Sequence, residues 1–378
     1  MKEIGLYLHF PFCMQKCRYC DFPSYAGREG QMGPYLEALF REMESYGDIS
    51  GEYEIGTIFM GGGTPTLYDG DSLVRVLDKC RECFPVREDA EITVECNPGT
   101  AGREKLCILG KGGFNRLSIG LQAWQDSLLG FLGRIHRRQQ FLDTIRWARE
   151  AGFVNLNADV IFGIPGQTLD EWLETLEKTA ACGITHLSAY SLKIEEGTVF
   201  YSWKCSGGLR EMEDEKEREL YHKGIALLHQ LGLEQYEISN FARKGFSCRH
   251  NLTYWRNGEY IGCGCGAHSH LHSIRCGNVK DIGTYIDRMN NGRPAIDFKE
   301  EIDSQTELFE TLMLGFRLKE GIRKKDFLDR YGFSLRNRYP KELEMLGAKG
   351  LIEEDAEAFR PTALGLDFEN TIALAFLK

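Results

Sequence analysis

The sequence lacks a long hydrophobic run and lacks an excess of basic residues. Its 46 Lys and Arg are outnumbered by 56 Asp and Glu, which gives a formal net charge of -10. Without an apolar stretch of membrane-spanning length, we expect no transmembrane segment. The acidic balance opposes broad nucleic-acid binding, which needs clustered basic residues. The start of the chain also lacks the pattern of a signal peptide, so we expect a cytoplasmic protein.

Low-complexity tracts and internal repeats are missing too, and the 378 residues predict one large domain plus a smaller one. Cysteine, in contrast, is plentiful, with 13 residues. In a long chain without a signal peptide, an odd number of cysteines argues against a disulfide framework. Clustered cysteines in a reducing compartment more often bind metal.

Strand-like and helix-like stretches alternate from the start of the chain to about residue 240. This alternation predicts an α/β fold in which helices connect parallel strands. The expected strands are 4–9, 56–60, 91–95, 116–120, 156–161 and 186–192. The expected helices between them include 35–46, 72–84, 140–151 and 169–182. Six such units fit a partial TIM-type (β/α)6 barrel, and a doubly wound sheet is the alternative.

We divide the chain into a barrel at 1–240, a connecting segment at 241–300 and a C-terminal domain at 301–378. A charged amphipathic helix at 211–231 closes the barrel region. The last part is mainly helical, and a short turn-like segment at 351–360 gives it a winged-helix-like pattern. Three acidic residues in the expected wing argue against DNA binding there, namely Glu353, Glu354 and Asp355.

Cys13, Cys17 and Cys20 form the one cysteine cluster with tight spacing. Three thiolates around a [4Fe–4S] cluster leave one iron without a protein ligand, as a cluster that binds a small molecule requires. The alternative is a structural zinc site with His9 as the fourth ligand. Zinc ligands usually come in two separated pairs, however, and His9 lies inside an expected strand.

A glycine-rich segment, Gly-Gly-Gly-Thr-Pro-Thr at 61–66, follows the second expected strand. We expect its backbone to approach a ligand closely and to expose N–H groups to a carboxylate or amine-bearing group. It lacks the Lys of a phosphate loop and the spacing of a dinucleotide fingerprint. Polar residues near the ends of later strands, Glu95, Gln122 and Asp159, belong to the same expected rim, because the carboxyl ends of parallel strands lie together.

These motifs resemble radical-SAM proteins related to oxygen-independent coproporphyrinogen III oxidase. The resemblance rests on Tyr-Leu-His-Phe-Pro-Phe-Cys at 7–13, on the cysteine spacing and on 61–66, and it continues through 115–122 and 159–168. It implies that Cys13, Cys17 and Cys20 hold a [4Fe–4S] cluster whose open iron binds S-adenosyl-L-methionine. Electron transfer from such a cluster splits that molecule into methionine and a 5′-deoxyadenosyl radical.

The resemblance also implies which residues surround S-adenosylmethionine. Gly62, Gly63 and Thr64 would contact its methionine end, and Tyr7 and Tyr19 would line the nucleoside pocket. Four further residues match polar positions that contact bound S-adenosylmethionine in the oxidase: Glu95, Gln122, Arg134 and Asp159. Carboxylates suit ribose hydroxyls, and the guanidinium fork of an Arg suits a carboxylate.

Two functions are known among the relatives that this resemblance implies. One is the dehydrogenase activity of the oxidase in porphyrin biosynthesis; the other is that of a HemW-type haem chaperone, which binds haem and passes it to acceptor proteins. Where the oxidase has a fourth cysteine this chain has Phe22, and only six residues precede Tyr7, where the oxidase has an N-terminal extension. His-Asn-Leu-Thr-Tyr-Trp at 250–255 matches a HemW-type pattern.

The resemblance therefore favours the haem chaperone, with haem-accepting proteins as partners and membrane-associated respiratory enzymes among the candidate acceptors. His250 is the candidate haem ligand, because a neutral imidazole suits haem iron and neighbouring aromatic rings suit a porphyrin. From the residues alone, a His that caps a turn beside two core aromatics is the alternative.

Two further hypotheses have less support. Cys263 and Cys265 make a second metal site conceivable, although we favour their packing as small residues at the barrel mouth. Other Cys and His residues nearby are Cys248, Cys276, His268, His270 and His272. A radical-SAM enzyme acting on RNA would use the basic patch of Arg134, His136, Arg137 and Arg138. That patch is short, and the net charge opposes it.

Overall fold

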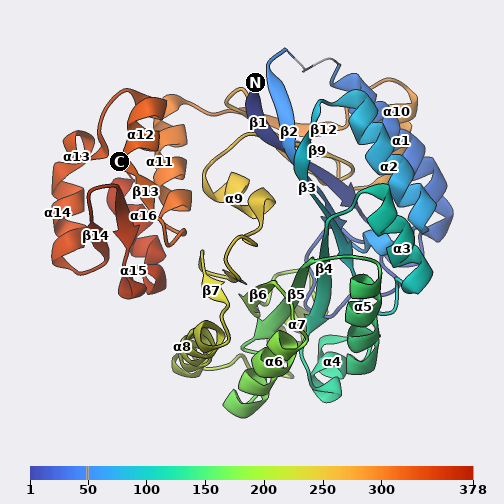
Figure 1. The fold of residues 1–378 in the computed structure, drawn as a ribbon, viewed down its shortest axis with the longest axis horizontal. Coiled ribbons are helices and arrows are strands. Elements are labelled where there is room, and N and C mark those ends of the chain that lie inside the picture. Colours follow the sequence, from blue (N-terminus) through green and yellow to red (C-terminus); the bar gives the residue numbers. More distant parts are fainter. Residues whose placement is uncertain (48, 50, 378) are drawn as a thin grey trace.

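Six parallel strands in sequence order form the centre of the fold in the computed structural model, which describes residues 1–47, 49 and 51–377 (Figure 1). These strands are β1 (Lys2–Phe10), β2 (Tyr53–Gly62), β3 (Val86–Cys96), β4 (Arg116–Gln122), β5 (Asn155–Phe162) and β6 (His186–Ser191). Each pairs in parallel with the next. A doubly wound sheet would reverse its strand order, so the α/β partial barrel is confirmed.

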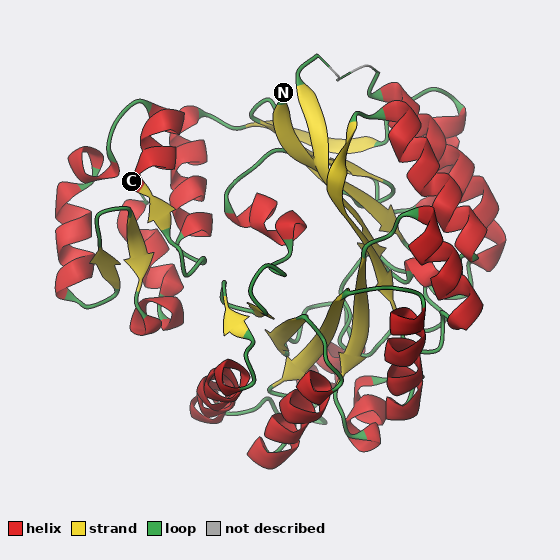
Figure 2. Ribbon diagram, viewed as in Figure 1, coloured by secondary structure: helices red, strands yellow, loops and turns green. Residues whose placement is uncertain are grey.

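Helices cover the convex side of this curved sheet (Figure 2). They are α1 (Met32–Ser45), α2 (Gly70–Cys83), α3 (Arg103–Gly112), α4 (Asp126–Leu132), α5 (Arg138–Glu150), α6 (Leu169–Ala181) and α8 (Asp214–Gln230). The short helix α7 (Val199–Cys205) lies instead against the loop that follows β1, where Phe200 N–H donates to the Arg18 oxygen at 3.0 Å. Local sequence sets their starts. Thr168, for example, forms a capping box with Glu171 at the beginning of α6. The central strands are buried by these helices and contain long apolar runs, as parallel strands usually do.

The segment at 241–300 adds strands to the sheet, which the sequence analysis did not foresee. On one side of β1 lie β9 (Tyr260–Cys263), β10 (His268–Leu271), β11 (Ile274–Asn278) and β12 (Ile296–Glu301). At the other edge β7 (Glu234–Gln235), which precedes this segment, pairs antiparallel with β8 (Asn240–Ala242), which pairs antiparallel with β6. The remaining helices of this region are α9 (Arg249–Trp255), on the concave side of the sheet, and α10 (Ile282–Asn290). The domain boundaries at 240 and 300 stay a prediction.

The C-terminal part has its own buried core and a three-stranded antiparallel sheet in the order β13-β15-β14. It consists of α11 (Ser304–Gly315), β13 (Ile322–Arg323), α12 (Lys324–Tyr331), α13 (Leu335–Arg338), α14 (Pro340–Ala348), β14 (Ile352–Glu354), β15 (Ala358–Pro361), α15 (Ala363–Asp367) and α16 (Glu369–Phe376). Acidic residues of the β14–β15 hairpin pair within the domain: Glu354 with Arg336, and Asp355 with Arg360 at 2.8 Å.

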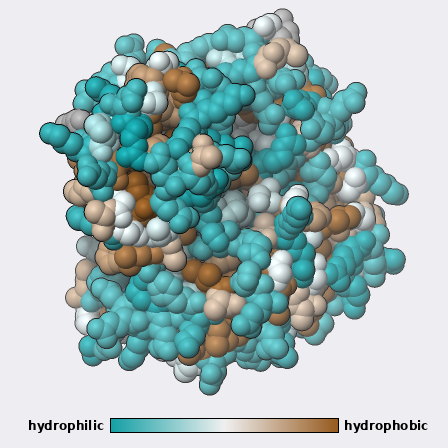
Figure 3. All heavy atoms as spheres, turned by 60° about the vertical axis from the view of Figure 1, so that its left-hand side comes forward, coloured by the Kyte–Doolittle hydropathy of each residue, from teal (hydrophilic) through white to brown (hydrophobic). Residues whose placement is uncertain are grey.

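No helix within the described ranges is long and apolar enough to cross a membrane. The face drawn in Figure 3 is mostly hydrophilic, and its apolar patches are separated by polar side chains.

Leu117 on β4 is fully buried between the sheet and its helices, so it measures how tightly this core is packed. Replacing Leu117 with Ala leaves a cavity and should lower the free energy of unfolding by about 2–5 kcal/mol. The matched control is Val154→Ala, at an exposed position just before β5, which should change it by less than about 0.5 kcal/mol. Urea denaturation checks both variants. Equal effects would mean that β4 does not lie in the core.

Candidate cluster and cofactor site

The backbone of the glycine-rich segment lies directly against the loop that carries the cysteines. Gly63 N–H donates to the carbonyl oxygen of Phe10 at 2.7 Å, and Thr64 N–H donates to that of Phe12 at 2.8 Å. A Cβ atom at position 63 would lie only 2.6 Å from the Phe12 oxygen, so glycine is required there by lack of space. The segment at 61–66 therefore anchors the cysteine loop, as well as facing the cavity beside it.

The same hydrogen bonds correct one expectation. Gly62 N–H donates to Glu95 Oε2 at 3.0 Å, and the N–H groups of Gly63 and Thr64 are used within the loop pair. The prediction that these N–H groups are exposed to a ligand is therefore wrong. A bound ammonium group is a donor and would be served by oxygen acceptors here, such as the Glu95 carboxyl group.

The three cysteines predicted to bind the cluster lie along the wall of one cavity of about 440 Å³. Each thiol has a polar neighbour on the rim. Cys13 Sγ is 3.6 Å from Thr64 Oγ1, and Cys17 Sγ accepts a hydrogen bond from Arg134 Nη1 at 3.4 Å. All three are free thiols and are partly exposed to this cavity. The spacing read from the sequence thus becomes three sulfur atoms facing the same space.

A single-ion site does not fit this arrangement. Across the described part of the chain, no three His, Cys, Asp or Glu side chains converge on one ion position. Cysteines around a four-iron cluster bind different irons, so convergence on one point is not expected of them. The zinc alternative also fails at His9, whose Nε2 donates to the Pro23 oxygen at 2.8 Å and whose Nδ1 accepts from Tyr7 at 2.9 Å. Because no three such side chains converge in the described part of the chain, a metal at Cys263 and Cys265 has no support either.

Two carboxyl groups, Glu95 and Asp159, face the cavity from neighbouring parts of the rim. Asp159 accepts hydrogen bonds from Asn157 Nδ2 at 2.8 Å and from Ser118 Oγ at 3.3 Å. Burial raises the pKa of Glu95 to about 8, and the charge of Asp159 adds to the rise. Burial also raises the pKa of Asp159. Glu95 is therefore largely protonated at neutral pH and acts as a polar rather than a charged group.

Gln122 ends β4 in a left-handed conformation, with φ at 72°. The pairing of β4 with β5 shifts between Gly120 and Gln122, so the strand bulges just before it ends. A left-handed non-glycine residue costs about 1–3 kcal/mol and persists where its surroundings hold it in place. Here the bulge directs the amide of Gln122 to the same cavity as Tyr19.

Arg134 is engaged within the protein. Besides Cys17, its guanidinium donates to Asn97 Oδ1 at 2.6 Å and to the Gly120 oxygen at 2.8 Å. It thus links the cysteine loop to the ends of β3 and β4 and places a positive charge beside Cys17, one of the three predicted cluster ligands. Its contact with a ligand carboxylate stays a prediction. Two residues of the basic patch considered for RNA binding are therefore not available to a nucleic acid: Arg134 is hydrogen-bonded within the protein, and His136 is only 3% exposed.

Asn97 is a site residue that the sequence analysis missed. Its Nδ2 donates to Thr64 Oγ1 at 2.7 Å while its Oδ1 accepts from Arg134. It directly follows β3, two residues beyond Glu95, so the rule that polar residues after parallel strands form the rim would have found it.

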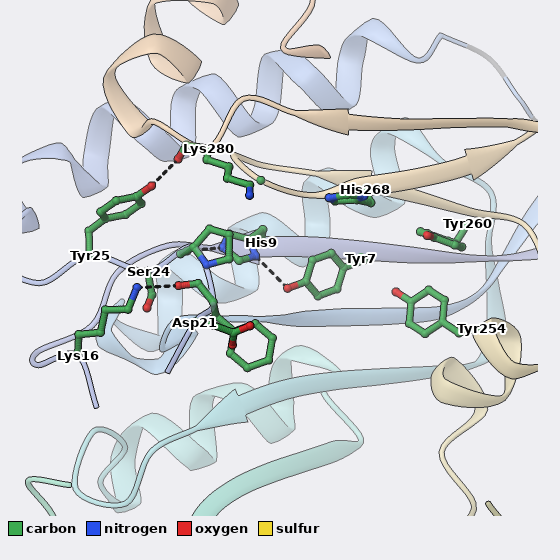
Figure 4. Close-up of a pocket in the computed structure, with 13 residues that line it drawn as sticks. Tyr7, His9, Lys16, Asp21, Ser24, Tyr25, Tyr254, Tyr260, His268 and Lys280 are labelled. Atoms are coloured by element: carbon green, nitrogen blue, oxygen red, sulfur yellow. Dashed lines mark hydrogen bonds between the residues drawn. The ribbon is translucent and has the colours of Figure 1, made fainter. Parts of the chain in front are cut away.

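Tyr7 lies in a second cavity of about 550 Å³ (Figure 4). This cavity adjoins the first, and four residues line both, namely Lys16, Asp21, Phe22 and Ser24. Tyr7 is absent from the described residues that line the first cavity. Tyr7 and Tyr19 thus line two adjoining cavities, and the contact of Tyr7 with the nucleoside of S-adenosylmethionine stays a prediction.

His250 is buried behind this second cavity and is 1% exposed. Its Nδ1 lies 2.8 Å from Thr57 Oγ1, and its Nε2 lies 2.8 Å from the Tyr254 hydroxyl. Burial lowers the pKa of His250 to about 3, so the ring is neutral. Its ring also stacks on Phe59. Coordination of an iron by His250 would require one hydrogen bond to break and Tyr254 to move.

Comparison with known proteins gives a consistent result along the chain. The radical SAM superfamily model matches residues 7–179, and the HemN C-terminal domain model matches residues 302–368. Proteins named heme chaperone HemW are similar over their full length. The one from Bacillus subtilis is 38% identical over 98% of both chains, and the one from Escherichia coli is 34% identical over 100% of this chain and 99% of that protein.

Among solved structures, coproporphyrinogen III oxidase (HemN) from Escherichia coli superposes with a TM-score of 0.85. The match covers 99% of this chain and 90% of that one, at 22% identity. At this identity the match establishes a shared fold.

Cys17→Ala removes one of the three predicted cluster ligands and should prevent stable assembly of the cluster. After anaerobic reconstitution we expect the unchanged protein to be brown with about four irons per chain, and the variant to be nearly colourless. Cys205→Ala, at an exposed cysteine outside both cavities, is the control and should keep full iron content. Iron analysis and visible absorption check this, and unchanged iron in Cys17→Ala would contradict the assignment.

Glu95 makes stability depend on pH. Its pKa is raised to about 8 in the folded protein, so its stabilising contribution is full below the unfolded pKa near 4.5 and is lost as pH rises toward 8. Glu95→Gln keeps an acceptor for Gly62 N–H but cannot ionise. In cluster-free protein, the free energy of unfolding of the variant should rise relative to that of the unchanged protein between pH 5 and 8, by at most about 1.4 kcal/mol per pH unit. Urea unfolding at several pH values measures this gain, and a constant difference would rule it out.

Proposed function

Because the chain belongs to the HemW family of radical-SAM proteins, we propose that it works as a haem chaperone that carries a [4Fe–4S] cluster. The observation that carries this proposal is full-length similarity to heme chaperone HemW proteins, at 38% and 34% identity for the two relatives described above. Two cavities side by side are the structural counterpart, since such a protein needs room for S-adenosylmethionine and for haem.

The first cavity fits the cluster and S-adenosylmethionine. Cys13, Cys17 and Cys20 would hold the cluster, which supplies a low-potential electron when bound. The residues of the chain provide the surroundings. Arg134 places a positive charge beside Cys17, and Asn97 ties Arg134 to Thr64. The predicted contacts of S-adenosylmethionine line the same cavity, except Tyr7, which lines the adjoining one. The residues that would contact S-adenosylmethionine in the first cavity are therefore Gly62, Gly63, Thr64, Tyr19, Glu95, Gln122, Arg134 and Asp159.

Haem is the cargo in this proposal, and haemoproteins are its acceptors. We place the transfer in the cytoplasm and include membrane-associated respiratory enzymes among the acceptors. The second cavity supports haem as cargo because tyrosine rings line it, and flat apolar rings suit a porphyrin face.

Coproporphyrinogen oxidation is the alternative activity, and the shared fold alone supports it. Position 22 argues against it. By the resemblance described above the oxidase has a cysteine there, whereas this chain has Phe22, which is 60% exposed and borders both cavities. An exposed aromatic side chain in this place suits contact with an apolar ligand better than it suits binding of iron.

Haem titration and a coproporphyrinogen assay on the same reconstituted protein separate the two functions. We expect about one haem per chain, transfer of that haem to an apo-haemoprotein, and no turnover of coproporphyrinogen. Absorption in the Soret region follows binding and transfer, and chromatography of porphyrins follows turnover. Turnover without stoichiometric haem binding would overturn the chaperone function in favour of the oxidase.

A further inference from the structure

The second cavity contains two histidines, and they differ in what their ring nitrogens do. Both nitrogens of His9 are used, by Pro23 and by Tyr7. His268 is exposed to the cavity, and its ring contacts Phe298 edge-on. Within the described residues His268 makes no side-chain hydrogen bond. An imidazole with open nitrogens beside a cavity is a ready ligand for a metal.

We propose that the haem lies in this second cavity and that the His268 imidazole is the axial ligand of its iron. The inference rests on the proposed haem-chaperone function and adds the place and the ligand. It replaces the hypothesis that His250 binds the iron, since His250 is buried and hydrogen-bonded at both nitrogens.

Three neighbouring strands create the space beside His268. Tyr7 on β1 pairs with Gly262 on β9, and the backbone of Gly262 lies against that of His268 on β10. A side chain at position 262 would collide with the His268 carbonyl oxygen, so glycine is what lets the backbones of β9 and β10 approach this closely beside Tyr7 and His268. Figure 4 shows the Tyr7 and His268 side chains at this cavity, on β1 and β10, with β9 between these two strands in the sheet.

Tyrosine rings supply the flat walls that a porphyrin needs. Tyr7, Tyr254 and Tyr260 line the cavity. The ring centroids of Tyr254 and Tyr260 lie 4.6 Å apart, and these two rings meet edge to face. Aromatic rings bury much apolar area, and their hydroxyl groups can remain in polar contact. A cavity of about 550 Å³ is also within the range of small-molecule sites.

Two basic side chains and one acidic side chain, Asp21, line the cavity, and the two basic ones suit the acidic groups of a porphyrin. Lys16 and Lys280 both line it, and ammonium groups are the natural partners of the two propionates of haem. Lys16 Nζ donates to the Phe22 oxygen at 3.1 Å, which leaves further donors on the same ammonium group. Burial and the positive charges of Lys280 and Arg275 lower the pKa of His268. The ring is therefore neutral, as coordination of iron requires.

His250 is then a positioning residue. Its Nε2 holds the Tyr254 hydroxyl at 2.8 Å, and its Nδ1 is fixed by Thr57. The His and Tyr of the motif at 250–255 thus form a pair in which the His orients a ring of the cavity wall. This gives the motif a role in haem binding without contact between His250 and iron.

Haem titration of four variants tests the assignment, with absorption and EPR spectra as readouts of the axial ligand. His268→Ala should weaken haem binding at least tenfold and lose the spectrum of histidine-ligated haem, and added imidazole should restore that spectrum. His268→Gln, closer in size, should show the same loss, which separates ligation from folding. His250→Ala should bind more weakly but keep the spectrum. His272→Ala, on the exposed turn after β10, should resemble the unchanged protein.

Three results would overturn the inference. One is a histidine-ligated spectrum that survives in His268→Ala without added imidazole. Another is its loss in His250→Ala but not in His268→Ala, which would restore His250 as the ligand. Both would leave the haem-chaperone function intact. The third is an unchanged protein that binds no haem, which would overturn that function together with the inference.

Discussion

The close contact between the glycine-rich segment and the cysteine loop is the constraint on which the rest of the site depends. Gly63 and Thr64 donate their N–H groups to the carbonyls of Phe10 and Phe12, and no side chain fits at position 63. This contact fixes the path of the chain just before Cys13. The three cysteines can therefore face one cavity although their loop contains neither helix nor strand of regular length. Glu95 and Asn97 extend the same network to β3.

The end of β1 also divides the site into two cavities. His9 packs against Gly62 on one side and lines the second cavity on the other, and its bonds to Pro23 and Tyr7 hold the ring in this position. Successive side chains on one face of a strand lie two residues apart, so Tyr7 and His9 share this face. One strand thus carries the cysteine loop at its end and a wall of the second cavity along its length.

The barrel could be predicted from the sequence because six apolar strands alternate with amphipathic helices, and the rim followed from polar residues at strand ends. The strands at 241–300 were missed because they are short and contain Gly262, Gly277 and polar residues, which weaken the alternation of a strand. Pairing partners far apart in sequence, such as Tyr7 with Gly262, leave no local signal.

Other differences arise because a sequence does not show which groups are already bonded. The N–H groups at 62–64, the guanidinium of Arg134 and the imidazole of His250 all have the right chemistry for a ligand, but the protein itself uses them. His268, whose nitrogens are open within the described residues, drew attention in the sequence only as part of a conceivable metal site.

By these observations the cluster and the haem occupy adjacent cavities separated by the end of β1. An anaerobic crystal structure of the reconstituted protein with haem bound tests it most directly. We expect a [4Fe–4S] cluster on Cys13, Cys17 and Cys20, and a haem between Tyr7 and Tyr260 with its iron on His268. A haem bound outside the second cavity, or an iron ligated by His250, would contradict it.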